Sequence, residues 1–181
     1  MSKRIETFLR KRSIHGQYSL GGKLDSTPID RVIVIPALAE RETLPKTLES
    51  LEACNLALLE TTLVLIVVNN RSAEHVSIDA IAENRETLEW LSSTPCPALR
   101  LAWIDASSPG NELVRKDGVG VARKIGMDRA TAILHEQKTQ HPLIICLDAD
   151  TLVESNYLDA LDAYAKREDA WAGVIRYAHR V

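Results

Sequence analysis

The chain has 181 residues, enough for one α/β domain with a sizeable core and few for two. Its 22 basic and 25 acidic residues give a net charge of −3, which argues against nucleic-acid partners because non-specific binding to nucleic acid needs a basic excess. The cysteines are odd in number and lack metal-type spacing, so we expect a reducing, cytoplasmic compartment. No stretch approaches the roughly 18 apolar residues needed to span a membrane.

Residues 1–30 contain Gly, Ser and Pro without clear periodicity, and we expect them to form an irregular arm before a domain of residues 31–181. The basic start, MSKRIETFLRKR, is not followed by the apolar region of a secretory signal. This arm could touch acidic lipid, which leaves peripheral membrane association of the full protein open, but a solvated tail is the favoured interpretation.

From residue 31 onward, short continuous apolar runs alternate with longer segments of helical periodicity. The apolar runs predict buried strands at 31–36, 62–68, 99–104, 142–147 and 170–177. The periodic segments predict helices at 43–54, 78–91, 118–137 and 155–166. Cys146 falls inside the fourth run and is predicted to be a buried thiol. This alternation predicts an α/β, Rossmann-like fold, in which a mainly parallel sheet carries helices on both faces.

Ligands of such sheets bind beyond the carboxyl ends of the strands, so the polar residues there are the candidates for function. Asp148 and Asp150 follow the fourth predicted strand, one residue apart. Both carboxylates could reach one Mg²⁺ or Mn²⁺, directly or through water, because these hard cations prefer oxygen ligands. Alternatively, the two aspartates merely begin the next turn, and Ser155 caps the helix after it. The geometry alone leaves both interpretations open.

Other phosphate- and metal-binding motifs match poorly. The segment GVGVARKIG has Arg123 where a dinucleotide-binding turn needs its third glycine, and it lies far from the first strand. An EF-hand loop fails at Leu152 and Val153. The sequence DADTL is a weak match to the nucleophile motif of haloacid-dehalogenase-type phosphatases. That motif belongs on the first strand of its domain, whereas Asp148 follows three earlier strands.

Four segments in order resemble the family 2 glycosyltransferases of the GT-A fold. VIVIPALAERETLPKTLESL is similar to their opening strand and helix, and LIVVNNRSAEH to their second strand and its turn. GVGVARKIGMDRA resembles their G-x-x-x-A-R helix start, and IICLDADTLVESNYLDAL their strand, D-x-D motif and following helix. The resemblance covers roughly residues 31–177. It implies transfer of a sugar from a nucleotide-diphosphate sugar to a hydroxyl acceptor, with Mn²⁺ or Mg²⁺.

The resemblance also implies roles for individual residues. Asp148 and Asp150 would bind the metal, and Asp148 also the diphosphate. The remaining residues expected to bind the nucleotide-sugar are Pro36, Ala37, Glu40, Asn69, Arg71 and Arg123. The chain departs from the family where Ala39 replaces the usual Asn and where NNR replaces DDG. An amide can both donate and accept, so the nucleobase stays open.

The resemblance places the acceptor wall and the catalytic base after the D-x-D half, beyond residue 181. That later segment often supplies a further metal-binding histidine as well, and His179 is a poor candidate for this role because only four residues follow Tyr177. We therefore expect a domain that is incomplete at its C-terminus, binds donor weakly and transfers sugar poorly by itself. Two other functions remain open: a phosphatase using Asp148 as nucleophile, and a non-catalytic nucleotide-binding or scaffold domain.

Overall fold

The computed structural model describes residues 3–93, 96, 98–114, 118–167, 172–176 and 178. Its core is a sheet in the order β1-β4-β3-β2-β5. The strands are β1 (Leu20–Gly21), β2 (Arg31–Ala37), β3 (Thr62–Asn69), β4 (Arg100–Ala106) and β5 (Leu143–Cys146). The β2, β3, β4 and β5 strands run parallel, and β1 pairs antiparallel with β4. The predicted Rossmann-like α/β fold is confirmed.

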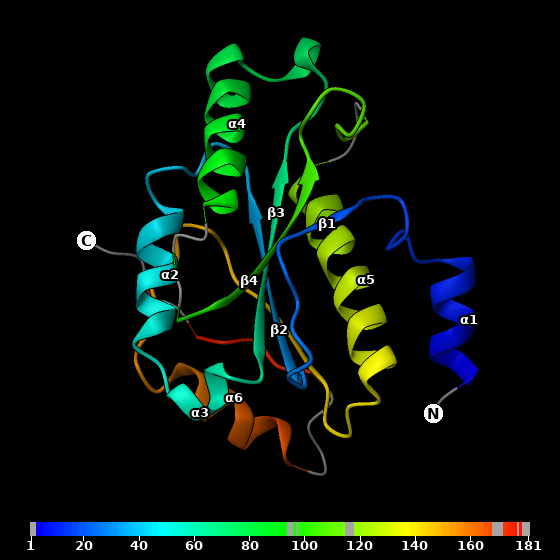
Figure 1. Cartoon of the computed structure of the whole chain (residues 1–181), viewed down its shortest axis with the longest axis vertical. Helices are drawn as coiled ribbons and strands as arrows, with labels where there is room; N and C mark the ends of the chain where they lie inside the picture. Colours follow the sequence, from blue (N-terminus) through cyan, green and yellow to red (C-terminus); the bar gives the residue numbers. More distant parts are fainter. Residues whose placement is uncertain are drawn as a thin grey trace.

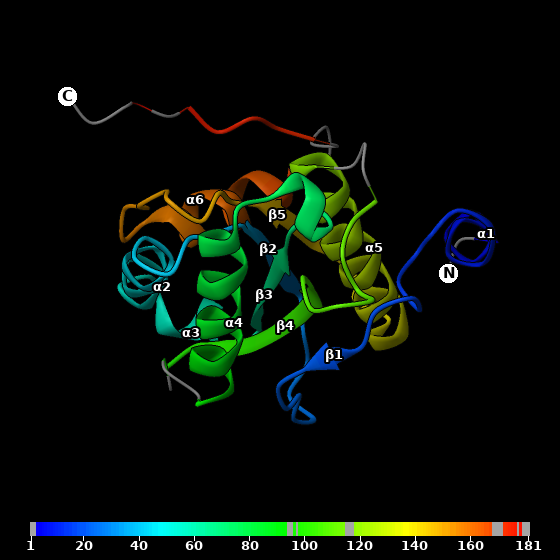
Figure 2. The same cartoon turned by 90° about the horizontal axis from the view of Figure 1, so that it is seen from above.

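Helices cover both faces of this sheet (Figures 1 and 2). They are α1 (Lys3–Lys11), α2 (Leu44–Glu52), α3 (Leu56–Leu59), α4 (Ile78–Ser92), α5 (Val119–Gln137) and α6 (Tyr157–Ala165), with a 3₁₀ turn at Ala73–His75. In Figure 2, α5 lies on one side of the strands, and α2 and α4 lie on the other.

The central strands are buried on both faces because successive side chains point to opposite sides. On β2, Ile33 and Ile35 face the core beneath α2, α4 and α6, whereas Val32 and Val34 face α5. All seven residues of β2 and all eight of β3 are buried, which explains why their sequences are continuous apolar runs rather than alternating ones.

One glycine sets how closely α5 approaches the sheet. A Cβ added to Gly126 would lie 2.2 Å from Val34 Cγ1 and 3.1 Å from Val67 Cγ2. Real side chains do not make contacts of 2.2 Å, so only glycine lets the helix backbone lie this near to β2 and β3. Gly126 therefore allows the backbone of α5 to pack directly against Val34 and Val67 of the two central strands.

The N-terminal thirty residues differ from the irregular arm that was expected, because they contain α1 and β1. Asp128 of α5 is buried, and its carboxylate accepts hydrogen bonds from the Ile14 N–H at 2.8 Å and from Lys124 at 2.6 Å. Arg100 of β4 donates to the carbonyl oxygens of Pro28 and Thr27. The arm is thus attached to the domain by specific polar contacts that involve single residues and leave no periodic pattern.

Two further predictions need correction. Cys146 is exposed, because among the described strands β5 pairs only with β2 and so forms an edge of the sheet. The strand expected at 170–177 does not form in residues 172–176, which have no regular structure and are exposed. Residues 168–171, Tyr177 and His179 lie outside the described part of the chain.

Candidate functional site

The carboxyl ends of β2, β3 and β5 meet at one edge of the sheet, because these three strands are parallel and β2 lies between the other two. This edge receives the loops after Ala37, Asn69 and Cys146. The sequence-predicted residues that follow these strands therefore belong to one region.

Residues 148–151, which follow β5 and are called the aspartate turn here, alternate between exposed and buried side chains. Asp148 and Asp150 are exposed, whereas Ala149 between them is 3% exposed and packs into the core. The Thr47 hydroxyl of α2 donates to the Ala149 carbonyl at 2.7 Å, and the Thr151 N–H donates to the Asp148 carbonyl at 3.1 Å. The buried alanine and its threonine partner fix the turn so that both carboxylates face solvent.

Arg123 lies near the start of α5 and forms an ion pair with Asp148. The Arg123 side chain is 36% exposed and that of Asp148 is 55% exposed. Screening by water makes an ion pair of this kind worth little, typically about 0–1 kcal/mol, so either partner can be drawn away by a stronger one. The structure thus brings together a base and an acid that the sequence had placed 25 residues apart.

The aspartate turn has the chemistry of a cation site, but an incomplete one. Among the described residues, no group of three or more His, Cys, Asp or Glu side chains could hold a metal ion. The chain offers Asp148 and Asp150, two exposed hard oxygen donors. Such a donor set fits Mg²⁺ or Mn²⁺ that takes its other ligands from a phosphorylated substrate and water, as these ions commonly do.

Asn69 at the end of β3 is buried, and both amide hydrogens are used inside the protein. Its Nδ2 lies 3.1 Å from the Ala37 carbonyl oxygen and 3.1 Å from that of Val67. Because both partners are acceptors, the nitrogen must be the atom that faces them. Any contact of the Asn69 side chain with a ligand is therefore left to Oδ1, which can only accept.

The loop after β2 takes an unusual backbone path. Pro36 and Ala37 belong to the buried strand, and Ala39 has φ = +55°, a left-handed conformation that few residues other than glycine adopt. The Glu40 carboxylate accepts a hydrogen bond from the Thr43 hydroxyl, just before α2 begins. A non-glycine residue held at positive φ is a feature that clusters at functional sites.

The loops after β3 and β4 support each other at the same edge. Arg71 is exposed, and its backbone forms a parallel bridge with Leu113. The Asp105 carboxylate of β4 accepts hydrogen bonds, each 2.9 Å long, from the Ser107 N–H and hydroxyl and from the Ser108 N–H. Burial raises the pKa of Asp105, but the hydrogen bonds from Ser108 and Ser107 outweigh it, so the pKa lies below its ordinary value of 3.8.

Sequence reasoning missed two residues that organise this region, Thr47 and Asn84. Asn84 is 1% exposed, although it lies in the middle of α4. A usable signal was present in both cases: a polar side chain occupied a position on the buried stripe of its helix. A buried polar group must find partners, so such a position predicts specific hydrogen bonds.

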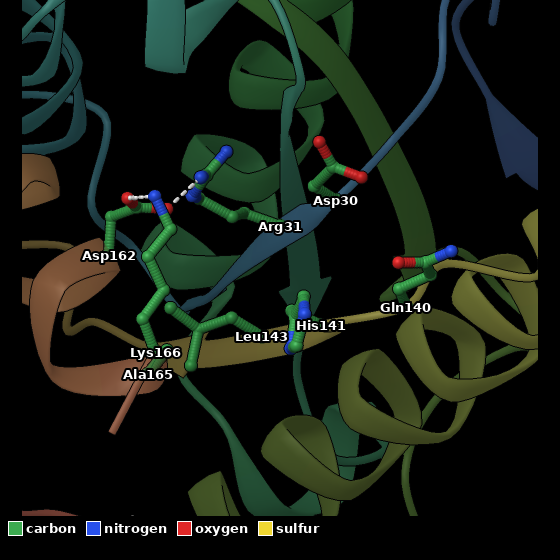
Figure 3. A pocket seen from close by; sticks show the side chains of 8 residues that line it. All are labelled: Asp30, Arg31, Gln140, His141, Leu143, Asp162, Ala165 and Lys166. Carbon is green, nitrogen blue, oxygen red and sulfur yellow. Dashed lines mark hydrogen bonds and ion pairs between the residues drawn. The ribbon is translucent and has the colours of Figure 1, made fainter. Parts of the chain in front are cut away.

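A polar cavity of about 380 Å³ opens at the opposite edge, where β2 and β5 begin (Figure 3). Within it, Asp162 of α6 pairs with Arg31 and with Lys166, the latter at 2.6 Å. Arg31 also donates to the Thr61 hydroxyl at 2.8 Å. Arg31, Asp162 and Lys166 are thus linked in one ion-pair network that joins α6 to the sheet, at the opposite end of the strands from the aspartate turn.

Comparison with known proteins gives only distant structural likenesses. No protein-family model and no curated protein matches the chain. A crystal structure of residues 1–349 of TarS from S. aureus, a glycosyltransferase, superposes with a TM-score of 0.47 and 14% identity. The likeness covers 75% of this chain and 32% of that one, so this chain spans about a third of its length.

No described helix is both long and apolar enough to cross a bilayer.

Proposed function

We propose that this chain is the donor-binding part of a metal-dependent, family 2-like glycosyltransferase of the GT-A type. The complete enzyme would move a sugar from a nucleotide-diphosphate sugar to a hydroxyl acceptor. The observation that carries the proposal is the meeting of Asp148, Asp150 and Arg123 at the carboxyl edge of a parallel sheet. Two carboxylates and a guanidinium beside the ends of β2 and β3 suit a diphosphate held through a cation.

The chemistry of the transfer explains why both signs of charge are needed. Cleaving the sugar–phosphate bond leaves a nucleoside diphosphate with growing negative charge. A bound divalent cation would supply positive charge to the leaving diphosphate without a proton donor. Asp148 and Asp150 would hold that cation, and Arg123 would donate charge-assisted hydrogen bonds to a phosphate oxygen.

The nucleoside would lie over the ends of β2 and β3, bordered by Pro36, Ala37 and Glu40, with Arg71 nearby. Only the amide oxygen of Asn69 is left to face a ligand, which favours a base that presents an N–H donor. Uracil and guanine present a ring N–H of this kind, whereas adenine would have to use its exocyclic amino group. We therefore propose a uridine or guanosine diphosphate sugar as the donor class.

The free cysteines favour a reducing compartment for this activity. All three cysteines are thiols, and Cys146 is exposed at the edge strand close to the aspartate turn. An exposed thiol persists most readily where glutathione keeps cysteines reduced, which supports the proposed cytoplasmic location.

Calorimetry of nucleotide binding tests the proposal directly. Uridine, guanosine and adenosine diphosphates are titrated with and without Mn²⁺, and the uridine or guanosine compound should bind in a Mn²⁺-dependent way. The double variant Asp148→Ala/Asp150→Ala should lose most of this affinity while its circular dichroism and melting temperature stay near wild type. The control Glu86→Ala/Glu89→Ala removes two exposed carboxylates from α4 and should bind normally. Unchanged affinity in the aspartate variant would sink the assignment.

A further inference from the structure

Asn84 of α4 connects the two loops on which the nucleoside is proposed to lie. Its Oδ1 accepts the Ala39 N–H at 2.9 Å, in the loop after β2. Its Nδ2 donates to the Asn69 carbonyl at 3.0 Å, at the end of β3, and to Asn70 Oδ1 at 2.8 Å, where the following loop begins. One amide thus ties together two chain segments that lie about 30 residues apart.

The orientation of this amide is fixed by its partners. A main-chain N–H requires an acceptor and a main-chain carbonyl requires a donor, so exchanging the oxygen and nitrogen would break both contacts. At 1% exposure, every polar atom of Asn84 is satisfied by the protein. Removing the side chain would leave the partly buried Ala39 N–H and the buried Asn70 amide without their present partner, which is costly.

The residue before Asn84 reinforces the same connection. Glu83 Oε1 accepts the Arg41 N–H at 2.8 Å, so adjacent α4 residues bind amides two apart in one loop. Between these anchored amides lies Glu40, and the first of them belongs to Ala39 at φ = +55°. The helix therefore holds the loop in a conformation that the chain would not readily adopt by itself.

The Asn84 network extends to the third strand of the site. Asn70, which is 2% exposed, donates through Nδ2 to the carbonyl oxygens of Arg71 and Ser107. Its main-chain N–H donates to the Ala106 carbonyl at the end of β4. Asn84 is thus linked to β4 through Asn70 and to the loop after β2 through Ala39.

We infer that Asn84 is a positioning residue, which sets the loops after β2 and β3 at the separation that a nucleoside requires. This inference rests on the proposed function and deepens it, because it divides the site into two parts. The aspartate turn is held by Thr47 of α2, whereas Asn84 belongs to α4 and bonds to the loops after β2 and β3. Loss of Asn84 should therefore impair recognition of the nucleoside and leave recognition of the diphosphate intact.

The division can be measured with two ligands that share the diphosphate. Uridine diphosphate and inorganic pyrophosphate are titrated calorimetrically in Mn²⁺ against wild type, Asn84→Ser and Asn84→Leu. We expect Kd for uridine diphosphate to rise about tenfold or more, equivalent to about 1.4 kcal/mol. Kd for pyrophosphate should stay within about twofold of wild type, a difference of less than about 0.5 kcal/mol.

Thr87 provides the matched control, because it is equally buried on the same face of α4. Its hydroxyl donates to the Glu83 carbonyl within the helix. Thr87→Val should lower the melting temperature without changing either Kd. The inference is overturned if both ligands weaken equally in the Asn84 variants, if neither weakens, or if Thr87→Val weakens uridine diphosphate as much.

The outcome for wild type separates this inference from the proposed function. If wild type binds neither ligand in Mn²⁺, the proposed function fails and the inference falls with it. If wild type binds uridine diphosphate but the Asn84 variants bind it equally well, only the positioning role is refuted. Because Asn84→Leu could unfold, Asn84→Ser, which is smaller and keeps a polar group, provides the second variant.

Discussion

Replacing Arg123 with methionine should affect the two ligands of the site in opposite directions. In the free protein Arg123 pairs with Asp148. A cation that binds without nucleotide must therefore displace the Arg123 guanidinium from Asp148, one of the two carboxylates proposed to hold the cation. Both side chains are more than a third exposed, which limits the pair to at most about 1 kcal/mol. A gain of about 0.4–1 kcal/mol corresponds to Mn²⁺ binding about two- to fivefold tighter in Arg123→Met without nucleotide.

With nucleotide present, the sign reverses. Arg123 is proposed to donate charge-assisted hydrogen bonds to a phosphate, and losing such a bond costs about 1.5–3 kcal/mol. Uridine diphosphate in saturating Mn²⁺ should therefore bind more than tenfold more weakly to Arg123→Met. Free Mn²⁺ is followed by electron paramagnetic resonance and the nucleotide by calorimetry. Weaker binding of Mn²⁺ alone, or unchanged binding of nucleotide, would refute the reasoning.

Lys138→Met is the matched control for charge. Lys138 follows the last turn of the same helix, so the substitution removes one positive charge from the other end of α5. A helix of 19 residues spans about 28 Å, several times the screening length at physiological salt. Neither ligand should change affinity in this variant.

Three other changes test the geometry around the site. Gly126→Ala should lower the free energy of unfolding by about 1–3 kcal/mol in urea titrations, because the added Cβ would clash with Val34. Gly120→Ala is the control and should be neutral or slightly stabilising, because no atom lies within 4 Å of its added Cβ. Asn69→Asp should be destabilising by about 1–3 kcal/mol at pH 7, because a carboxylate would face the Ala37 and Val67 carbonyls; a fully stable variant would contradict this placement. Asp105 has a depressed pKa, so the contribution of its carboxylate to folding stability is complete above the unfolded pKa near 3.8 and is lost as the pH falls below that value. The difference in the free energy of unfolding between wild type and Asp105→Asn should therefore be about 1–2 kcal/mol at pH 7 and shrink toward pH 3.

The sequence predicted those parts of the fold that depend on periodic burial. The β2 and β3 strands read as continuous apolar runs because α5 covers one face and α2 and α4 cover the other. The exposure of Cys146 could not be predicted in the same way. A strand at the edge of a sheet has the same composition as a central one, and its exposure depends on which strands pair with it.

The charged residues of the site could be predicted from the sequence, but the partners of the buried polar residues that hold its loops could not. Asp148 and Asp150 stood out because two charges follow a continuous apolar run. Asn84 did not stand out, since its importance comes from partners on two loops that only the fold brings near α4. Asn69 was expected to face the base with an amide able to donate and accept. The fold commits both of its hydrogens to carbonyl oxygens, which simplifies its chemistry to that of an acceptor.

Ala39 tests how much strain the site holds. At φ = +55° its Cβ crowds the following carbonyl, at a cost of roughly 1–2 kcal/mol that glycine does not have. Ala39→Gly removes this cost but adds about 0.4–1 kcal/mol of unfolded-state entropy, so the variant should gain up to about 1.5 kcal/mol or break even. Ala39→Val should instead lose about 2 kcal/mol or more, because β-branched residues tolerate positive φ worst. Ala37→Gly is the control from the adjoining strand, where backbone geometry is regular and glycine should be destabilising. If Ala39→Gly proves as destabilising as Ala37→Gly in urea titrations, the loop does not hold strain, and Asn84 would have no unfavourable conformation to stabilise.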